Sequence, residues 1–252
     1  MASVNNPHLD LRHRRDEPEW LDGTDIDPVE LERVLRGLAN FNGAFLGHYP
    51  ILKWLRMAIK ASPKEKPLTI VDVGCGYGAY GCALIQLGKN CFGCDVNFTY
   101  LQEAQRHGLP VATVDSTLPF ADRTFDSVLL FEVIEHVPNM NNLLQECFRV
   151  ARRNVLITVP NSEDIELMKA NDVTYAHMLS SDHVNFFDAD SLRTVLRHYT
   201  DNVSVERSDP IYPFWFAVRS VPFYAMRVLF RTGILKPRFF TRLYAVARVG
   251  DL

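Results

Sequence analysis

The chain has 252 residues, enough for a sizeable α/β core, and we expect a single domain over residues 20–252. Its formal net charge of −3 is close to neutral, so charge gives no reason to expect a nucleic-acid partner. Residues 1–19 are polar and charged, which predicts a disordered tail without a secretory or membrane-spanning pattern. We therefore expect a cytoplasmic protein.

The first predicted elements along the chain are two helices. Apolar residues recur at helical spacing after Asp27-Pro28, which predicts a helix over residues 28–39. A second helix is predicted over residues 43–60, and it ends before Ser62-Pro63.

From Leu68 the pattern changes to short apolar runs that alternate with helical stretches, which is typical of a mainly parallel sheet. The predicted strands cover residues 68–73, 90–95, 110–114, 124–131 and 153–159. The predicted helices lie near residues 79–88, 98–107, 139–150, 163–170 and 189–199, with Asn139, Ser162 and Asp188 as N-caps. Two later strands, 203–206 and 243–249, could form an antiparallel pair at one sheet edge.

An aromatic-rich insertion over residues 210–240 contains no acidic residue. Its basic residues are Arg219, Arg227, Arg231, Lys236 and Arg238. One interpretation is a helical lid whose arginines surround a hydrophobic pocket. The other is an element that lies on an anionic membrane surface and gives peripheral membrane contact.

The five cysteines include one C-x-x-C pair, Cys91 and Cys94. A zinc site of this kind needs a second pair at similar spacing, and the sequence has none. We therefore expect no metal site and buried, reduced thiols.

A glycine-rich turn follows the first predicted strand, within Ile-Val-Asp-Val-Gly-Cys-Gly-Tyr-Gly-Ala-Tyr-Gly at residues 70–81. Glycine lets the backbone turn tightly and approach a ligand without a Cβ between them. Gly76, Gly78 and Gly81 also satisfy the dinucleotide fingerprint, so the loop alone does not identify its ligand.

Acidic residues near the strand ends narrow the choice of ligand for this glycine loop. Asp95 closes the second predicted strand, where a carboxylate can accept both hydroxyls of a ribose. Asp72 precedes the glycines, and its charge would repel a pyrophosphate but suit the ammonium of a methionine moiety. Asp115 and Ser116, after the third strand, can hydrogen-bond an adenine edge.

Four motifs occur together in order: V-D-V-G-C-G-x-G at residues 71–78, Asp95, D-S-T-L-P-F-A-D-x-x-F-D at 115–126 and E-V-I-E-H-V at 132–137. This set resembles class I S-adenosylmethionine-dependent methyltransferases of the ubiquinone/menaquinone-biosynthesis-like, type 11 superfamily. The resemblance covers residues 68–160.

The resemblance implies an α/β fold: a doubly wound, mainly parallel seven-stranded sheet, Rossmann-like, with one antiparallel edge strand. It further implies an N-terminal helical lid over 20–62, a cofactor-binding core over 68–160, and an acceptor-side region over 161–252 with a helical insertion before the last strand. The implied cofactor is S-adenosyl-L-methionine. Its implied binding residues are Asp72, Gly74, Cys75, Gly76, Asp95, Val96, Asp115, Ser116 and Glu132, with Glu132 near the sulfonium.

Methyl transfer to a hydroxyl requires a base, and His136 and His183 are the two candidates. Asp182 could orient one of them, and a purely structural role for His136 is equally open. The expected reaction is O-methylation of a small or lipid-like metabolite, such as a polyketide phenol, a quinone precursor or a sugar hydroxyl. The alternatives are an NAD(P)-dependent oxidoreductase and a non-catalytic cofactor-binding protein. The oligomeric state stays open.

Overall fold

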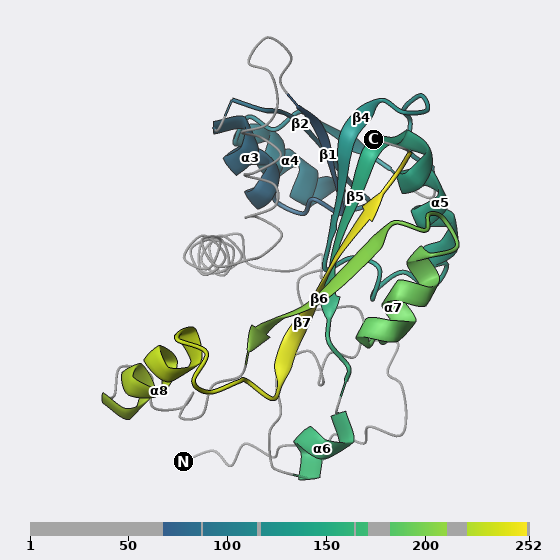
Figure 1. Ribbon diagram of the computed structural model, residues 1–252. Helices are drawn as coiled ribbons and strands as arrows, with labels where there is room; N and C mark the ends of the chain where they lie inside the picture. The colour runs from purple at the N-terminus through teal and green to yellow at the C-terminus, as the bar shows by residue number, and fades with distance from the viewer. Residues whose placement is uncertain are drawn as a thin grey trace, which may run out of the picture.

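Seven strands form one sheet in the order β3-β2-β1-β4-β5-β7-β6 (Figure 1). This computed structural model describes residues 68–86, 88–114, 117–163, 165–170, 182–210 and 221–250. The predicted tail at 1–19, the helices at 28–39 and 43–60 and the lid assigned to 20–62 lie outside the described residues.

The first five strands are parallel, as predicted. They are β1 Thr69–Val73, β2 Asn90–Asp95, β3 Val111–Thr113, β4 Phe125–Phe131 and β5 Ala151–Pro160. From β1 the chain adds β2 and β3 on one side, and it then returns to add β4 and β5 on the other side. The order of the strands therefore reverses between β1 and β4. Ligands of open α/β sheets bind at the carboxyl ends of strands beside such a point.

Two further strands complete the sheet, β6 Val203–Pro210 and β7 Phe240–Arg248. The prediction that they pair antiparallel at one side of the sheet is confirmed. The implied antiparallel edge strand is wrong in one respect, because β7 lies between β5 and β6 and leaves β6 at the edge. Burial explains this order: the run from Leu243 to Ala245 is buried, whereas most of β6 is polar and at least partly exposed.

Helices cover both faces of the sheet (Figure 1). Helices α3 Ala79–Gln86 and α4 Phe98–Arg106 pack on one face, and α5 Met140–Val150 and α7 Ala189–Leu196 pack on the other. The remaining described helices are α6 Ile165–Ala170 and α8 Val221–Arg231, which lies within the 210–240 insertion. None of the helices in the described ranges is long and apolar enough to cross a membrane.

The two faces of β4 enter two hydrophobic clusters. Val128 and Leu130 pack in the cluster that contains Leu144 of α5, while Leu129 packs with Leu101 of α4. All seven residues of β4 are buried, as expected for a parallel strand covered on both sides. Burial on both sides fixes the end of β4 firmly beside the end of β1.

Helix starts follow the predictions in part. Asp188 caps α7 in a capping box with Ser191, as predicted. Asn139 stands at the N-cap position of α5, but its side chain makes no capping hydrogen bond. Helix α6 begins at Ile165 rather than at 163, and the amide of Glu163 donates to the side chain of Asn161, one residue before the predicted cap.

Candidate active site

The glycine loop joins β1 to α3 at the carboxyl end of the sheet. The amides of Gly74 and Cys75 both donate to the carbonyl of Cys94 on β2, over 2.8 and 2.9 Å. Gly74 has φ +73°, and a Cβ there would lie 2.4 Å from Cγ2 of Val133 in the turn after β4. Only glycine fits this position, so the ends of β1 and β4 come into direct contact.

Asp95, the last residue of β2, is tied to the glycine loop. Its Oδ2 accepts the amide of Gly76 over 2.8 Å, and its Oδ1 accepts the amide of Asn97 over 2.9 Å. The side chain of Asn97 in turn caps α4. These bonds fix the carboxylate at the mouth of the loop, which is where the sequence predicts a ribose ligand.

Asp72 lies one residue before the end of β1 and is 1% exposed. Its Oδ2 makes no hydrogen bond within the described part of the chain. Burial, and next the nearby carboxylate of Asp95, raise the pKa of Asp72 to about 7, against a smaller lowering by the amide of Gly81. A buried carboxyl with an unused oxygen is suited to a cationic ligand group.

Open space lies at the glycine loop itself. Gly76 has φ +49°, and a Cβ built on it would meet no atom within 4 Å among the described residues. The loop therefore presents bare backbone to open space at Gly76, whose amide donates to the Asp95 carboxylate. The residues present fit the amino-acid and ribose parts of an adenosyl sulfonium.

Four further predicted cofactor residues are Cys75, Val96, Asp115 and Ser116. Cys75 is buried, and burial raises the pKa of its thiol far above the ordinary value, so it stays protonated. Val96 is 71% exposed beside Asp95. Asp115 and Ser116 lie outside the described residues.

Glu132 follows β4 with φ +57°, a left-handed conformation that is uncommon for a residue with a side chain. Its carboxylate lies 3.1 Å from Nε of Arg242, which comes from β7 and also reaches Asp209 over 3.2 Å. The sequence gives no sign of this contact, because Arg242 reaches Glu132 only through the placement of β7 beside β5. The ion pair neutralises part of the acidic charge at this edge.

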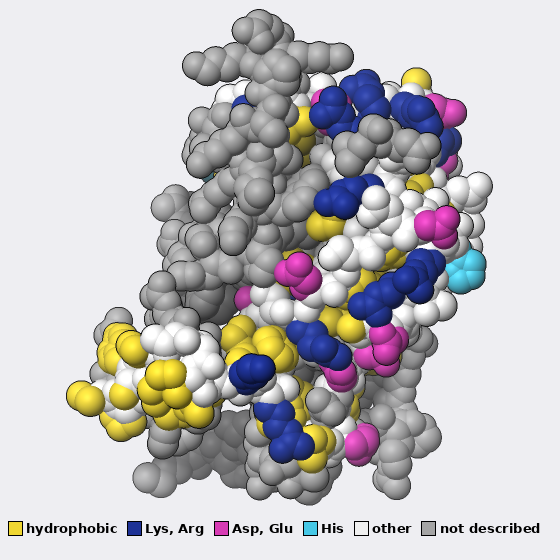
Figure 2. All heavy atoms as spheres, in the orientation of Figure 1, with side chains coloured by type: hydrophobic (Ala, Val, Ile, Leu, Met, Phe, Trp, Pro, Cys, Tyr) yellow, Lys and Arg dark blue, Asp and Glu magenta, His cyan; other side chains and the backbone are white. Residues whose placement is uncertain are grey.

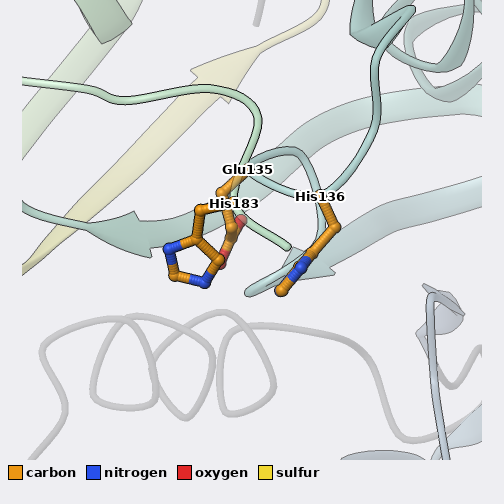
Figure 3. A group of neighbouring side chains, drawn as sticks. All are labelled: Glu135, His136 and His183. Atoms are coloured by element: carbon orange, nitrogen blue, oxygen red, sulfur yellow. The ribbon is translucent and has the colours of Figure 1, made fainter. Parts of the chain in front are cut away.

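The two candidate bases lie together in the structure. The imidazoles of His136 and His183 meet edge to face with centroids 4.7 Å apart. Nδ1 of His136 lies in hydrogen-bonding contact with the carboxylate of Asp182, the residue predicted to orient a histidine. Figure 3 shows both rings beside Glu135, in the turn after β4.

Glu135 is the residue that sequence reasoning left without a role. It is 1% exposed, and neither carboxylate oxygen makes a hydrogen bond within the described residues. Burial, and next the carboxylate of Glu132, raise its pKa well above the ordinary value. The E-V-I-E-H-V motif contained the signal, since its acid stands directly before a candidate histidine.

This sheet order, with a glycine loop after β1 and a fixed acid at the end of β2, defines the Rossmann-like fold of class I methyltransferases. Residues 71–159 match the family described as methyltransferase domain. The matched segment runs from β1 to β5 and contains the glycine loop, Asp95 and the turn after β4.

Two curated relatives that match part of this chain are named as methyltransferases. A probable S-adenosylmethionine-dependent methyltransferase from Mycolicibacterium smegmatis is 31% identical over 145 residues, 53% of this chain and 52% of that protein. A ubiquinone biosynthesis O-methyltransferase from Pseudomonas fluorescens is 28% identical over 109 residues, 40% of this chain and 45% of that protein. These matches span about half the length of the curated relatives.

A crystal structure of a SAM-dependent methyltransferase from Archaeoglobus fulgidus superposes with a TM-score of 0.60 at 19% identity. It covers 88% of this chain and 100% of that chain. At this identity the likeness establishes the fold, and it confirms the prediction of a Rossmann-like methyltransferase sheet.

Proposed function

We propose that this protein is an S-adenosylmethionine-dependent methyltransferase that methylates an oxygen of a small or lipid-like metabolite. The observation that carries the proposal is the buried Asp72 carboxyl, with an unused oxygen, on the strand that leads into the open backbone at Gly76. A pyrophosphate would be repelled there, which disfavours the NAD(P)-dependent alternative. The match of residues 71–159 to the methyltransferase domain family supports the same choice.

The chain's residues then divide the binding task. We assign the ammonium to Asp72, the backbone contacts to Gly74, Cys75 and Gly76, and the ribose hydroxyls to Asp95. The adenine falls to Val96, Asp115 and Ser116, and Glu132 lies toward the sulfonium. When bound, the cofactor supplies an electrophilic methyl group, so the protein's part is alignment of the acceptor and exclusion of water.

A hydroxyl acceptor must lose its proton during the transfer. His136 and His183 are within reach of one another, and Asp182 holds Nδ1 of His136, which leaves Nε2 as the basic nitrogen. In this proposal the histidines face the acceptor and take its proton. The name of the ubiquinone biosynthesis relative supports oxygen as the acceptor atom.

Calorimetry tests the cofactor and a labelled-methyl assay tests the reaction. We expect one molecule of S-adenosylhomocysteine to bind with micromolar affinity and NAD to show no heat. Labelled methyl should then appear in at least one member of a panel of phenols, quinols and glycans. Binding of NAD without S-adenosylhomocysteine would overturn the proposal, and binding without transfer to any acceptor would favour the non-catalytic alternative.

We also propose that α8 contacts an anionic membrane surface, so that a lipid-like acceptor can enter from it. Val221, Tyr224 and Val228 are exposed at helical spacing along α8, and Lys236 and Arg238 are exposed just after it. Figure 2 shows hydrophobic side chains gathered over α8 with basic side chains nearby. An apolar helix face beside basic residues is typical of interfacial helices.

Vesicle sedimentation tests the membrane contact. Vesicles with anionic phospholipid should sediment the wild-type protein, neutral vesicles should not, and Lys236→Glu with Arg238→Glu should abolish the difference. Lack of sedimentation at low salt would leave α8 as a lid over the acceptor pocket.

A further inference from the structure

We infer that Glu135, His136 and His183 form a binding site for one divalent transition-metal cation. One ligand atom from each residue lies within 4.8 Å of those of the other two (Figure 3). Zn²⁺ binds imidazole nitrogen and carboxylate oxygen at about 2.0–2.2 Å, so a small rotation of the side chains closes the three atoms around an ion. The cysteine spacing predicts no metal, but this set uses no cysteine.

The buried Glu135 carboxyl is the first reason to expect a cation. It is 1% exposed, and both of its oxygens lack a hydrogen-bond partner among the described residues. A buried carboxyl without partners costs folding free energy unless a positive charge or donor satisfies it. A cation between Glu135 and the two imidazoles supplies that charge.

The second reason is the contact between Asp182 and His136. The carboxylate of Asp182 holds Nδ1 of His136, which fixes the ring and leaves Nε2 as the nitrogen available to an ion. Metal-bound histidines in proteins commonly have their second nitrogen held in this way by a carboxylate. The same contact would also orient a catalytic base. The buried Glu135 carboxyl is therefore the feature that favours a metal ligand over a base at His136.

The backbone around the cluster is already fixed. The amides of Val184 and Asn185 both donate to the carbonyl of Glu135, over 2.7 and 3.0 Å. Nδ2 of Asn185 donates to the carbonyls of Ile134 and Val137, each over 2.8 Å. These bonds join the loop that carries His183 to the turn that carries the other two ligands, so no large movement is needed for binding.

The ligand types select the ion. Two imidazoles with one carboxylate suit Zn²⁺, Co²⁺ and Mn²⁺, whereas Mg²⁺ prefers oxygen ligands and retained water. Three protein ligands leave a coordination position open, and the side chain of His136 is 36% exposed. If the proposed methyl transfer holds, the ion would replace the histidines as the group that activates the acceptor. An acceptor hydroxyl would occupy the open position, the ion would lower the pKa of that hydroxyl, and its proton would pass to solvent.

Metal titration of the chelator-treated, untagged full-length protein tests the site without any turnover. We expect one equivalent of Mn²⁺ or Zn²⁺ to bind by calorimetry, and Co²⁺ to give visible absorption bands typical of nitrogen and oxygen ligands. Glu135→Gln and His183→Gln should each weaken binding at least tenfold. The matched control is His107→Gln, because His107 pairs with Glu103 at an exposed position outside the cluster.

Thermal unfolding in chelator shows whether each variant folds. Added metal should raise the melting temperature of the wild type and of His107→Gln, and should leave that of Glu135→Gln unchanged. Absence of stoichiometric binding, or equal binding by Glu135→Gln and wild type, overturns the metal site. Binding of S-adenosylhomocysteine is measured separately in the presence of chelator. A failure of the cofactor proposal can then be distinguished from a failure of the metal-site proposal.

Discussion

The amide of Gly76 donates to Oδ2 of Asp95 over 2.8 Å, across a separation of 19 residues. This bond joins the glycine loop after β1 to the carboxyl end of β2. The acid that should bind the ribose is therefore positioned by the same backbone that leaves room for the rest of the ligand. Four experiments test this arrangement, the ionisation of Asp72 and the cap of α7.

Asp95→Asn should weaken binding of S-adenosylhomocysteine about 10- to 100-fold, or roughly 1.4–2.8 kcal/mol. The amide keeps one acceptor, but it loses the charge and can present an N–H group to the amide of Gly76. Calorimetry measures the change. Asp201→Asn, at an exposed position, is the control and should bind as wild type; equal affinity of both variants would remove Asp95 from the site.

Gly74→Ala and Gly76→Ala should have different effects. Gly74→Ala combines a left-handed φ with a methyl 2.4 Å from Val133, so we expect a loss of about 2–4 kcal/mol in the free energy of unfolding. Gly76→Ala adds backbone strain alone, about 1 kcal/mol, but its methyl enters the open ligand region and should weaken cofactor binding.

Urea unfolding and calorimetry separate the two effects of these glycine variants. Val133→Ala should partly restore the stability of Gly74→Ala by removing the clashing methyl groups. A stable Gly74→Ala protein would contradict the contact between the two loops.

The stability of the protein should depend on the ionisation of Asp72. Its pKa is about 7 in the folded protein and 3.8 as the ordinary value, so between these values only the folded state holds the proton. The contribution of Asp72 to the free energy of unfolding is therefore greatest below pH 3.8. It falls by up to about 1.4 kcal/mol per pH unit up to pH 7, and is constant above it.

Asp72→Asn cannot ionise, so its stability relative to wild type should rise from pH 5 to pH 7 and then stay level. Urea unfolding at four pH values measures the difference. Binding of a cationic ligand group beside Asp72 would also displace the proton of the Asp72 carboxyl. Calorimetry near pH 6.5 in buffers of different ionisation enthalpy detects this proton release. A pH-independent difference between the two proteins would show that Asp72 has an ordinary pKa.

The cap of α7 should contribute a measurable part of the stability. Oδ1 of Asp188 accepts the amides of Asp190 and Ser191, and Asp188→Ala should cost about 1 kcal/mol in the free energy of unfolding. Asp190→Ala removes only an exposed pair with Arg193 and should change stability by less than about 0.5 kcal/mol. Equal losses in the two variants would argue against the capping box.

Local sequence was sufficient for much of the fold. Alternation of apolar runs with helical periodicity predicts strands close to β1, β2 and β4, because each is a short buried segment bounded by turn residues. Gly74, Gly76 and Asp95 were also predictable from local sequence. A positive φ favours glycine, and Asp95 stands at the end of a recognisable strand.

Only the tertiary structure decided the contacts between distant segments. The position of β7 inside the sheet, and hence the pairing of Arg242 with Glu132, depends on which strand face is buried once the sheet has formed. The grouping of Glu135 with His183 depends on a loop that docks through the backbone amides of Val184 and Asn185 and the side chain of Asn185. Long-range packing, rather than residue type, brings these groups together, so periodicity and motif spacing carry no record of it.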